Sequence, residues 1–83
     1  MKQYWISFRS LTYAQRAASL LERKGLTATI VRLPQLLSKR GCGYALIVRC
    51  PIRQAAALLG EAKIPWSQVF QRLESGEFQE VEP

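Results

Sequence analysis

The chain has 83 residues, a formal net charge of +6 and a hydrophobic content of 48%. The length predicts a single domain, and the hydrophobic content excludes wholesale disorder. No apolar run approaches the roughly 18 residues that span a bilayer, and the N-terminus lacks the apolar segment of a signal peptide, so we expect a cytoplasmic protein with no membrane partner.

A strand and a helix open the chain. Residues 3–9 alternate with period two, which is typical of a half-buried strand, and Trp5 is expected on the face opposite the apolar one. An alanine-rich stripe at helical spacing follows, with Ser10 or Thr12 as its N-cap and Gly25 as its C-cap. The pattern therefore predicts a strand-helix unit.

The middle of the chain predicts three more strands and a second helix. Its strands are rich in β-branched and aromatic residues, and its helix starts at a proline whose missing N–H costs nothing there. The expected elements are strands at 27–33, 44–50 and 67–73, a helix from Pro51 to just before Pro65, and a loop at 34–43 that contains one helical turn.

The charge is divided unevenly along the chain. Residues 2–72 carry all twelve cations and two of the six glutamates, a net charge of +10, whereas residues 74–83 carry the other four, a net charge of −4. A basic body attracts anionic partners. We expect a domain at 1–73 followed by an acidic C-terminal segment at 74–83, either a loose tail or a weak edge strand.

The element order β-α-β-β-α-β predicts a ferredoxin-like α+β sandwich. Its sheet is expected to have four antiparallel strands, with both helices on one face, because this is the simplest packing that keeps the crossovers right-handed. The other face would stay open. Since Trp5 is expected there, that face is a candidate surface for a homodimer.

The sequence contains no histidine and no aspartate. A Ser-His-Asp or Cys-His arrangement and a His-containing metal site are therefore excluded within one chain, and two thiols supply at most half of a tetrahedral zinc site. We expect no metal and no cofactor. Thiols in a cytosolic chain are expected to be reduced, and any nucleophile here depends on cations and backbone dipoles for activation.

Cys42 is the candidate functional thiol. Gly41 and Gly43 flank it, and Lys39 and Arg40 precede it. Positive charge and free backbone N–H groups favour a thiolate, persulfide or selenide at such a position. The alternative interpretation is a small residue in a turn whose glycines serve backbone geometry alone.

Cys50 is a second-rank candidate at the start of the second helix. The helix dipole would lower the pKa of its thiol, but a buried, inert cysteine at the end of a strand is the favoured interpretation. An extended strand from residue 43 to 50 would separate Cys42 from Cys50 by about 25 Å, too far for a disulfide.

Nucleic acid is not the expected partner of the basic surface. The aromatic side chains Tyr4 and Phe8 share the apolar face of the first strand, and no aromatic-glycine RNA-binding pattern is present. A solvated cationic surface is the favoured interpretation of the basic residues, which include Arg9, Arg32, Lys39, Arg40, Arg49 and Arg53.

Residues 34–46 resemble a segment of the putative Se/S carrier protein-like family of small bacterial and archaeal proteins. The shared residues are Pro34, Leu37, Ser38, Cys42, Gly43, Ala45 and Leu46. The resemblance extends from about Tyr4 to Phe70, and Gln35 stands where the family usually has arginine. The resemblance implies that Cys42 is the functional residue and that Ser38 is a secondary candidate.

The leading hypothesis is a sulfur or selenium carrier that uses Cys42, with Lys39 and Arg40 stabilising the anion and guiding the docking of donor and acceptor proteins. A carrier or binding protein is expected more than an enzyme. The alternative is a non-catalytic regulatory module that binds proteins or anions through its basic surface. A third hypothesis is a redox-sensing thiol.

Overall fold

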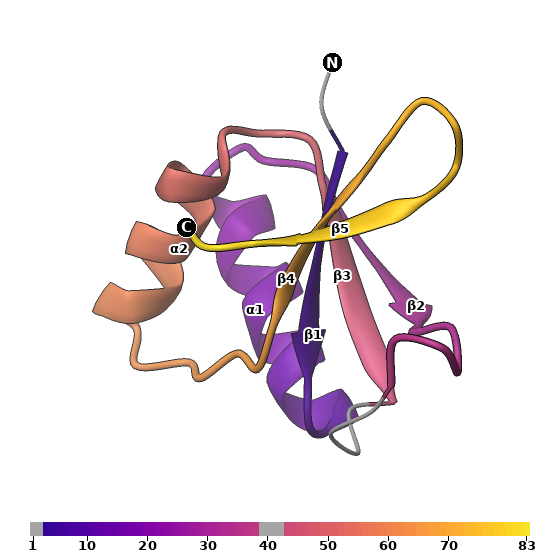
Figure 1. The fold of residues 1–83 in the computed structure, drawn as a ribbon. Helices are drawn as coiled ribbons and strands as arrows, with labels where there is room; N and C mark the ends of the chain where they lie inside the picture. The colour runs from indigo at the N-terminus through magenta and orange to yellow at the C-terminus, as the bar shows by residue number, and fades with distance from the viewer. Residues whose placement is uncertain (1–2, 39–42) are drawn as a thin grey trace.

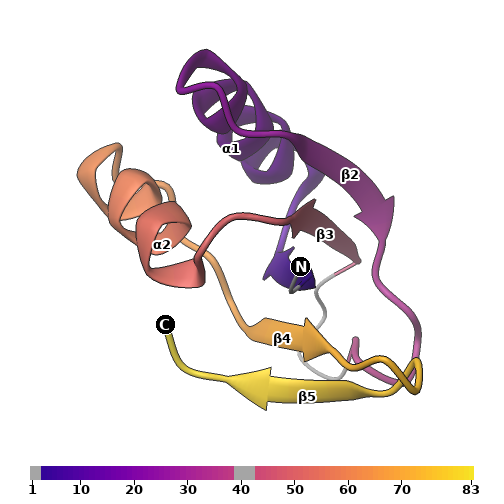
Figure 2. The same cartoon turned by 90° about the horizontal axis from the view of Figure 1, so that it is seen from above.

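The computed structural model describes residues 3–38 and 43–83, which form two helices and five strands. In chain order these elements are β1 (Gln3–Phe8), α1 (Leu11–Arg23), β2 (Ala28–Arg32), β3 (Tyr44–Val48), α2 (Ile52–Glu61), β4 (Val69–Arg72) and β5 (Phe78–Val81). Every strand pair is antiparallel, and the strand order is β2-β3-β1-β4-β5. Both helices lie on one side of the sheet (Figures 1 and 2). Neither helix in the described part of the chain is long and apolar enough to cross a membrane.

The predicted α+β class is confirmed, with its two helices and its antiparallel sheet, but the predicted number of strands is wrong. A fifth strand, β5, pairs with β4 from Val69↔Val81 to Arg72↔Phe78. Gly76 makes this hairpin possible, because its φ of 91° lies in the left-handed region that favours glycine. The acidic segment after residue 73 therefore contains an edge strand.

Helix α1 begins and ends at the residues that its sequence indicates. The side chain of Ser10 accepts a hydrogen bond from the backbone N–H of Tyr13 (3.3 Å), which caps the first turn. Gly25, at a φ of 80°, follows the last turn. The buried face consists of Ala14, Ala17, Ala18 and Leu21.

Helix α2 ends before the position just ahead of Pro65 at which the sequence predicts its end. The last helical residue is Glu61, and Lys63 then takes a φ of 57°, which is uncommon for a residue with a side chain. The next N–H, that of Ile64, donates to the carbonyl of Leu59 (2.9 Å). Ile64 is buried, so its packing holds the turn and directs the chain toward β4.

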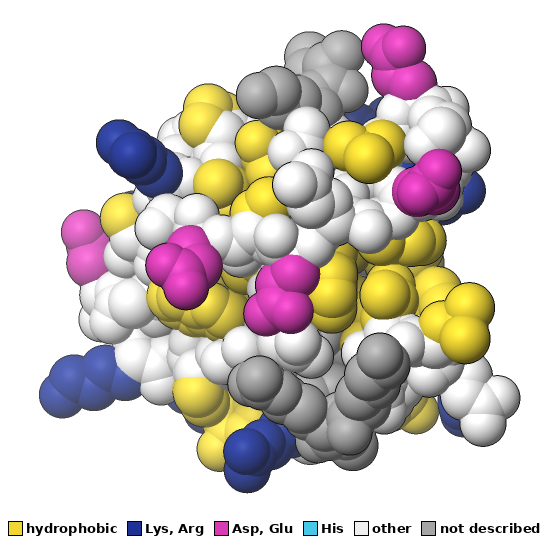
Figure 3. Space-filling model, viewed as in Figure 1, with side chains coloured by type: hydrophobic (Ala, Val, Ile, Leu, Met, Phe, Trp, Pro, Cys, Tyr) yellow, Lys and Arg dark blue, Asp and Glu magenta, His cyan; other side chains and the backbone are white. Residues whose placement is uncertain are grey.

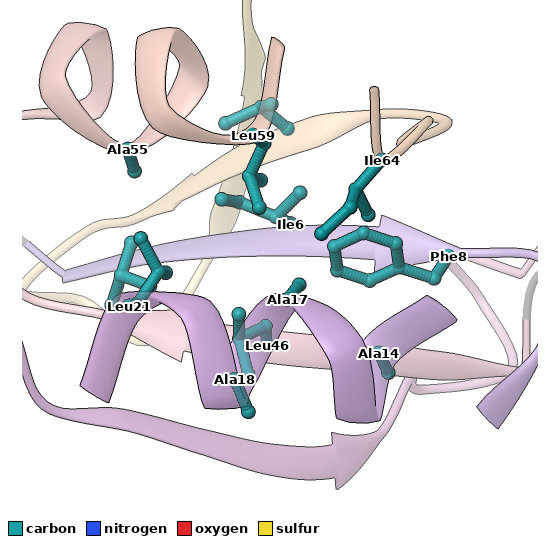
Figure 4. Close-up of a cluster of buried hydrophobic side chains, with 12 residues drawn as sticks. Ile6, Phe8, Ala14, Ala17, Ala18, Leu21, Leu46, Ala55, Leu59 and Ile64 are labelled. Atoms are coloured by element: carbon teal, nitrogen blue, oxygen red, sulfur yellow. The ribbon is translucent and has the colours of Figure 1, made fainter. Parts of the chain in front are cut away.

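The main core fills the space between the two helices and the sheet (Figure 4). Alanines on the buried face of α1 let the helix approach the strands closely, and larger side chains from β1 and α2 fill the remaining space. Its buried members are Ile6, Phe8, Ala14, Ala17, Ala18, Leu21, Leu46, Val48, Ala55, Leu59, Ile64 and Val69.

A second apolar cluster covers the sheet face that is turned away from the helices. Trp5 points to this face as expected, but it is only 7% exposed because other residues cover it. Its ring meets Phe78 of β5 edge to face, at 4.9 Å between centroids, and the Arg72 guanidinium lies 5.8 Å from the Trp5 ring. Figure 3, viewed onto the side that β5 crosses, shows hydrophobic side chains between acidic ones. Dimerisation through this face stays a prediction.

Ser7 ties the chain before β4 to the centre of the sheet. Its hydroxyl, fully buried, accepts from the N–H of Gln68 (2.9 Å) and donates to the Gln68 carbonyl (3.2 Å). The Ser7 backbone makes two more bonds of 2.8 Å, to the Gln68 carbonyl and from the Ser67 N–H. These four bonds fix the position of residues 67 and 68 relative to β1.

The contact of β5 with Trp5 predicts that Phe78→Ala destabilises the protein. Phe78 is half-buried, so its removal is expected to lower the free energy of unfolding by about 1–2 kcal/mol. Gln79→Ala, an exposed position on the same strand, is the matched control and should change it by less than about 0.5 kcal/mol. Urea unfolding measures both. Equal stability of the two variants would contradict a structural role for the packing of β5.

Candidate functional site

The predicted functional loop connects β2 to β3. Four of the predicted site residues, Lys39, Arg40, Gly41 and Cys42, lie outside the described residues. The structure does describe the two flanks of that segment, Ser38 and Gly43.

A hydrogen-bonded stem holds the flanks of the loop. Arg32 and Tyr44 face each other as the last pair of the β2–β3 ladder, and the Arg32 guanidinium lies 5.6 Å from the centroid of the Tyr44 ring. One residue further along, the N–H of Leu33 donates to the Gly43 carbonyl (3.1 Å). The two ends of the loop therefore leave the sheet side by side.

The first part of the loop forms the predicted turn. The N–H of Leu37 donates to the Pro34 carbonyl (2.9 Å), and the N–H of Ser38 donates to the Gln35 carbonyl (3.2 Å). The second apolar cluster anchors the turn to the sheet, because Leu33 is one of its buried members and Leu37 packs against it; the other buried members are Trp5, Ala45 and Phe70. Leu36 is 85% exposed and faces solvent beside the candidate site.

Neither backbone strain nor crowding requires glycine at position 43. Gly43 does not take a positive φ, and no described residue other than its chain neighbour lies within 4 Å of the position that a Cβ would occupy. What glycine provides here is open space at the residue that directly follows Cys42. The predicted anion-binding role of this backbone stays a prediction.

A pocket lies at the same end of the sheet as the loop. Phe8 pairs with Tyr44, so Arg9 and Gly43 occupy corresponding positions just beyond that pair. Arg9 lines the pocket together with Tyr13 of α1 and with Trp66 from the segment before β4. The sequence indicates Arg9 only as a surface cation and gives no sign of the two aromatic residues, because no local pattern relates position 66 to position 9.

Cys50 lies beyond the opposite end of β3. Its side chain is half-buried and packs against the main core. Burial raises the pKa of the Cys50 thiol, while the backbone N–H groups of Cys50 and Ala55 oppose the increase. The protonated thiol is therefore favoured, in agreement with the interpretation of Cys50 as a poorly reactive residue.

The described residues contain no group of three or more histidine, cysteine, aspartate or glutamate side chains that is able to hold a metal ion. In sequence, the loop and its flanks supply one thiol, guanidinium and ammonium groups, hydroxyls and backbone amides.

The raised pKa predicts how Cys50 reacts with an alkylating reagent. In a Cys42→Ser variant, Cys50 is expected to react slowly with iodoacetamide at pH 7, because only the thiolate is nucleophilic and burial disfavours it. The rate should rise with pH, and its midpoint should lie above that of the same variant unfolded in guanidinium chloride. A midpoint below that of the unfolded chain would contradict this description of Cys50.

The comparison with family models agrees with the resemblance drawn from residues 34–46. The family described as Putative Se/S carrier protein-like matches residues 3–71, which cover every element from β1 to most of β4. No protein with curated annotation and no solved structure matches the chain. The matched region includes the Cys42 loop and its stem, and the chain belongs to the Se/S carrier protein-like family.

Proposed function

We propose that this protein carries a sulfur or selenium atom on Cys42 and passes it between partner proteins. The observation that carries the proposal is the family match, which spans the loop and bears a description of Se/S carriage. The absence of histidine from the sequence limits the chemistry further, because the thiol has no imidazole base to activate it.

The transfer is a thiol–disulfide type exchange. The Cys42 thiolate attacks the outer sulfur of a donor persulfide, the donor S–S bond breaks, and the donor cysteine leaves as a thiolate. Cys42 then holds the outer sulfur as a persulfide. An acceptor thiolate attacks that sulfur in the second step, and the Cys42 thiolate leaves unchanged. No external oxidant is needed, because the transferred sulfur keeps its oxidation state. Selenium in a donor S–SeH group follows the same course.

The sequence around Cys42 supports this assignment more than the surroundings of Cys50 do. Lys39 and Arg40 are close to Cys42 in sequence and stabilise a thiolate or persulfide anion, whereas burial raises the pKa of the Cys50 thiol. Between two thiols, the one with the larger thiolate fraction at neutral pH is the better nucleophile for this exchange.

The partners of the carrier are the proteins that load and unload Cys42. The exposed Leu36 lies in the turn that leads to the cationic segment, so a partner meets an apolar side chain beside positive charge. Acidic surfaces with a small apolar contact are the complementary chemistry. Charge guides the encounter, and the apolar contact adds to the affinity.

The carrier function predicts a persulfide on Cys42. After incubation with a cysteine desulfurase and free cysteine, intact-protein mass spectrometry should find an added mass of one sulfur atom, about 32 Da, that dithiothreitol removes. Peptide mapping should locate the adduct on Cys42.

Two variants serve as controls for this experiment. Cys50→Ser should be loaded to the same extent as the natural chain, and Cys42→Ser should lose the adduct. A chain that gains no sulfur under conditions that load an authentic carrier, or one that is loaded on Cys50 alone, would contradict the proposed function.

A further inference from the structure

The pocket beside the loop has the size and the chemistry of a small-ligand site. Its volume is about 420 Å³, within the range of pockets that bind small molecules. Among the residues that the structure describes, five line it: Arg9, Tyr13, Pro65, Trp66 and Ser67. They come from the end of β1, the first turn of α1 and the segment before β4, so the pocket exists only in the folded chain.

The fold holds the backbone of the pocket walls before any ligand binds. The backbone of Ser67 is tied to Ser7, and the hydroxyl of Ser7 bridges both backbone groups of Gln68. Trp66 is half-buried against the main core. The Ser10 cap holds the turn of α1 that carries Tyr13. A preformed site loses little conformational entropy when it binds.

The side chains in the pocket combine one cation with two aromatic rings. No carboxylate is among the described lining residues, so none of them neutralises the charge of Arg9. Guanidinium groups bind phosphate oxygens through paired hydrogen bonds, and tryptophan and tyrosine rings stack on nucleobases. We propose that this pocket binds a nucleotide, with its phosphate at Arg9 and its base against Trp66 and Tyr13.

The nucleotide is either a free mononucleotide or one unit of a single-stranded RNA, and a neighbouring groove allows the two to be distinguished. It lies between α1 and the segment that follows α2, and Arg16 and Arg23 line it, again with no carboxylate among the described lining residues. Arg9, Arg16 and Arg23 recur every seven residues, which places the two helical members on one side of α1. A free mononucleotide uses Arg9 alone, whereas a single-stranded RNA that continues along the helix also meets Arg16 and Arg23.

This binding site does not depend on the carrier function. None of the five lining residues that the structure describes belongs to the loop, so Cys42→Ser is expected to bind the nucleotide as the natural chain does. Loss of sulfur loading with intact nucleotide binding, or the reverse, would identify which of the two proposals had failed.

Titration of the full chain with adenosine monophosphate, followed by NMR, tests the proposal. The indole N–H resonance of Trp66, assigned with a Trp66→Phe variant, should shift and saturate, while that of the buried Trp5 should stay in place. Adenosine, which lacks the phosphate, and inorganic phosphate, which lacks the base, should each bind at least about tenfold more weakly, because each keeps only one of the two interactions.

Matched variants separate the roles of charge and stacking. Arg9→Gln and Tyr13→Ala should each weaken the binding of adenosine monophosphate about tenfold. Arg53→Gln and Leu11→Ala remove an exposed cation and an exposed apolar side chain outside the pocket, and they should leave the affinity unchanged. Circular dichroism verifies that each variant is folded.

Binding of a short oligoadenylate shows whether the ligand is a free mononucleotide or a unit of single-stranded RNA. If it binds more tightly than the mononucleotide and loses that advantage in an Arg16→Gln, Arg23→Gln double variant, the ligand is a unit of single-stranded RNA. Equal affinities assign the pocket to free nucleotides. The proposal is overturned if the Trp66 resonance does not respond, if Arg9→Gln and Tyr13→Ala bind normally, or if a glutamate-rich peptide saturates the pocket and adenosine monophosphate does not.

Discussion

The pairing of β1 on both of its edges is the constraint on which the rest of the structure depends. β3 pairs with one edge and β4 with the other, so β1 is the middle of the five strands. Its alternation sends Ile6 and Phe8 toward the helices and Trp5 into the second cluster. Because the register with β3 ends at Phe8↔Tyr44, it also brings Arg9 and Gly43 to the same end of the sheet.

The sequence was sufficient for the features that short-range patterns determine. The period of two in β1 and the alanine stripe of α1 are local, and so is the Ser10 cap. The sequence left open whether residues 74–83 form a loose tail or a weak edge strand, because β5 is short and is held by pairing with β4 and by contact between Phe78 and Trp5. The end of α2 depends on the packing of Ile64 and not on the nearby proline.

The candidate site likewise has one part that local sequence patterns predict and another part that only the fold brings together. The residues of the loop are predicted from composition, since a cysteine between glycines and after two cations is conspicuous in any sequence, and their role stays a prediction. The pocket was not found, because Arg9, Tyr13 and Trp66 meet only through the fold. The hydrogen bonds of Ser7 that fix its wall join residues separated by 61 positions. Sequence patterns indicate a reactive group more readily than they indicate its surroundings.

The central claim is that Cys42 is a nucleophile activated by cations and backbone amides, without an imidazole. The most direct test is the pH dependence of alkylation of Cys42 in a Cys50→Ser variant, where no other thiol contributes. We predict that the nearby positive charge holds the pKa of Cys42 below the ordinary value of a cysteine. A pKa at or above about 8.5, the ordinary value of a cysteine, would contradict it.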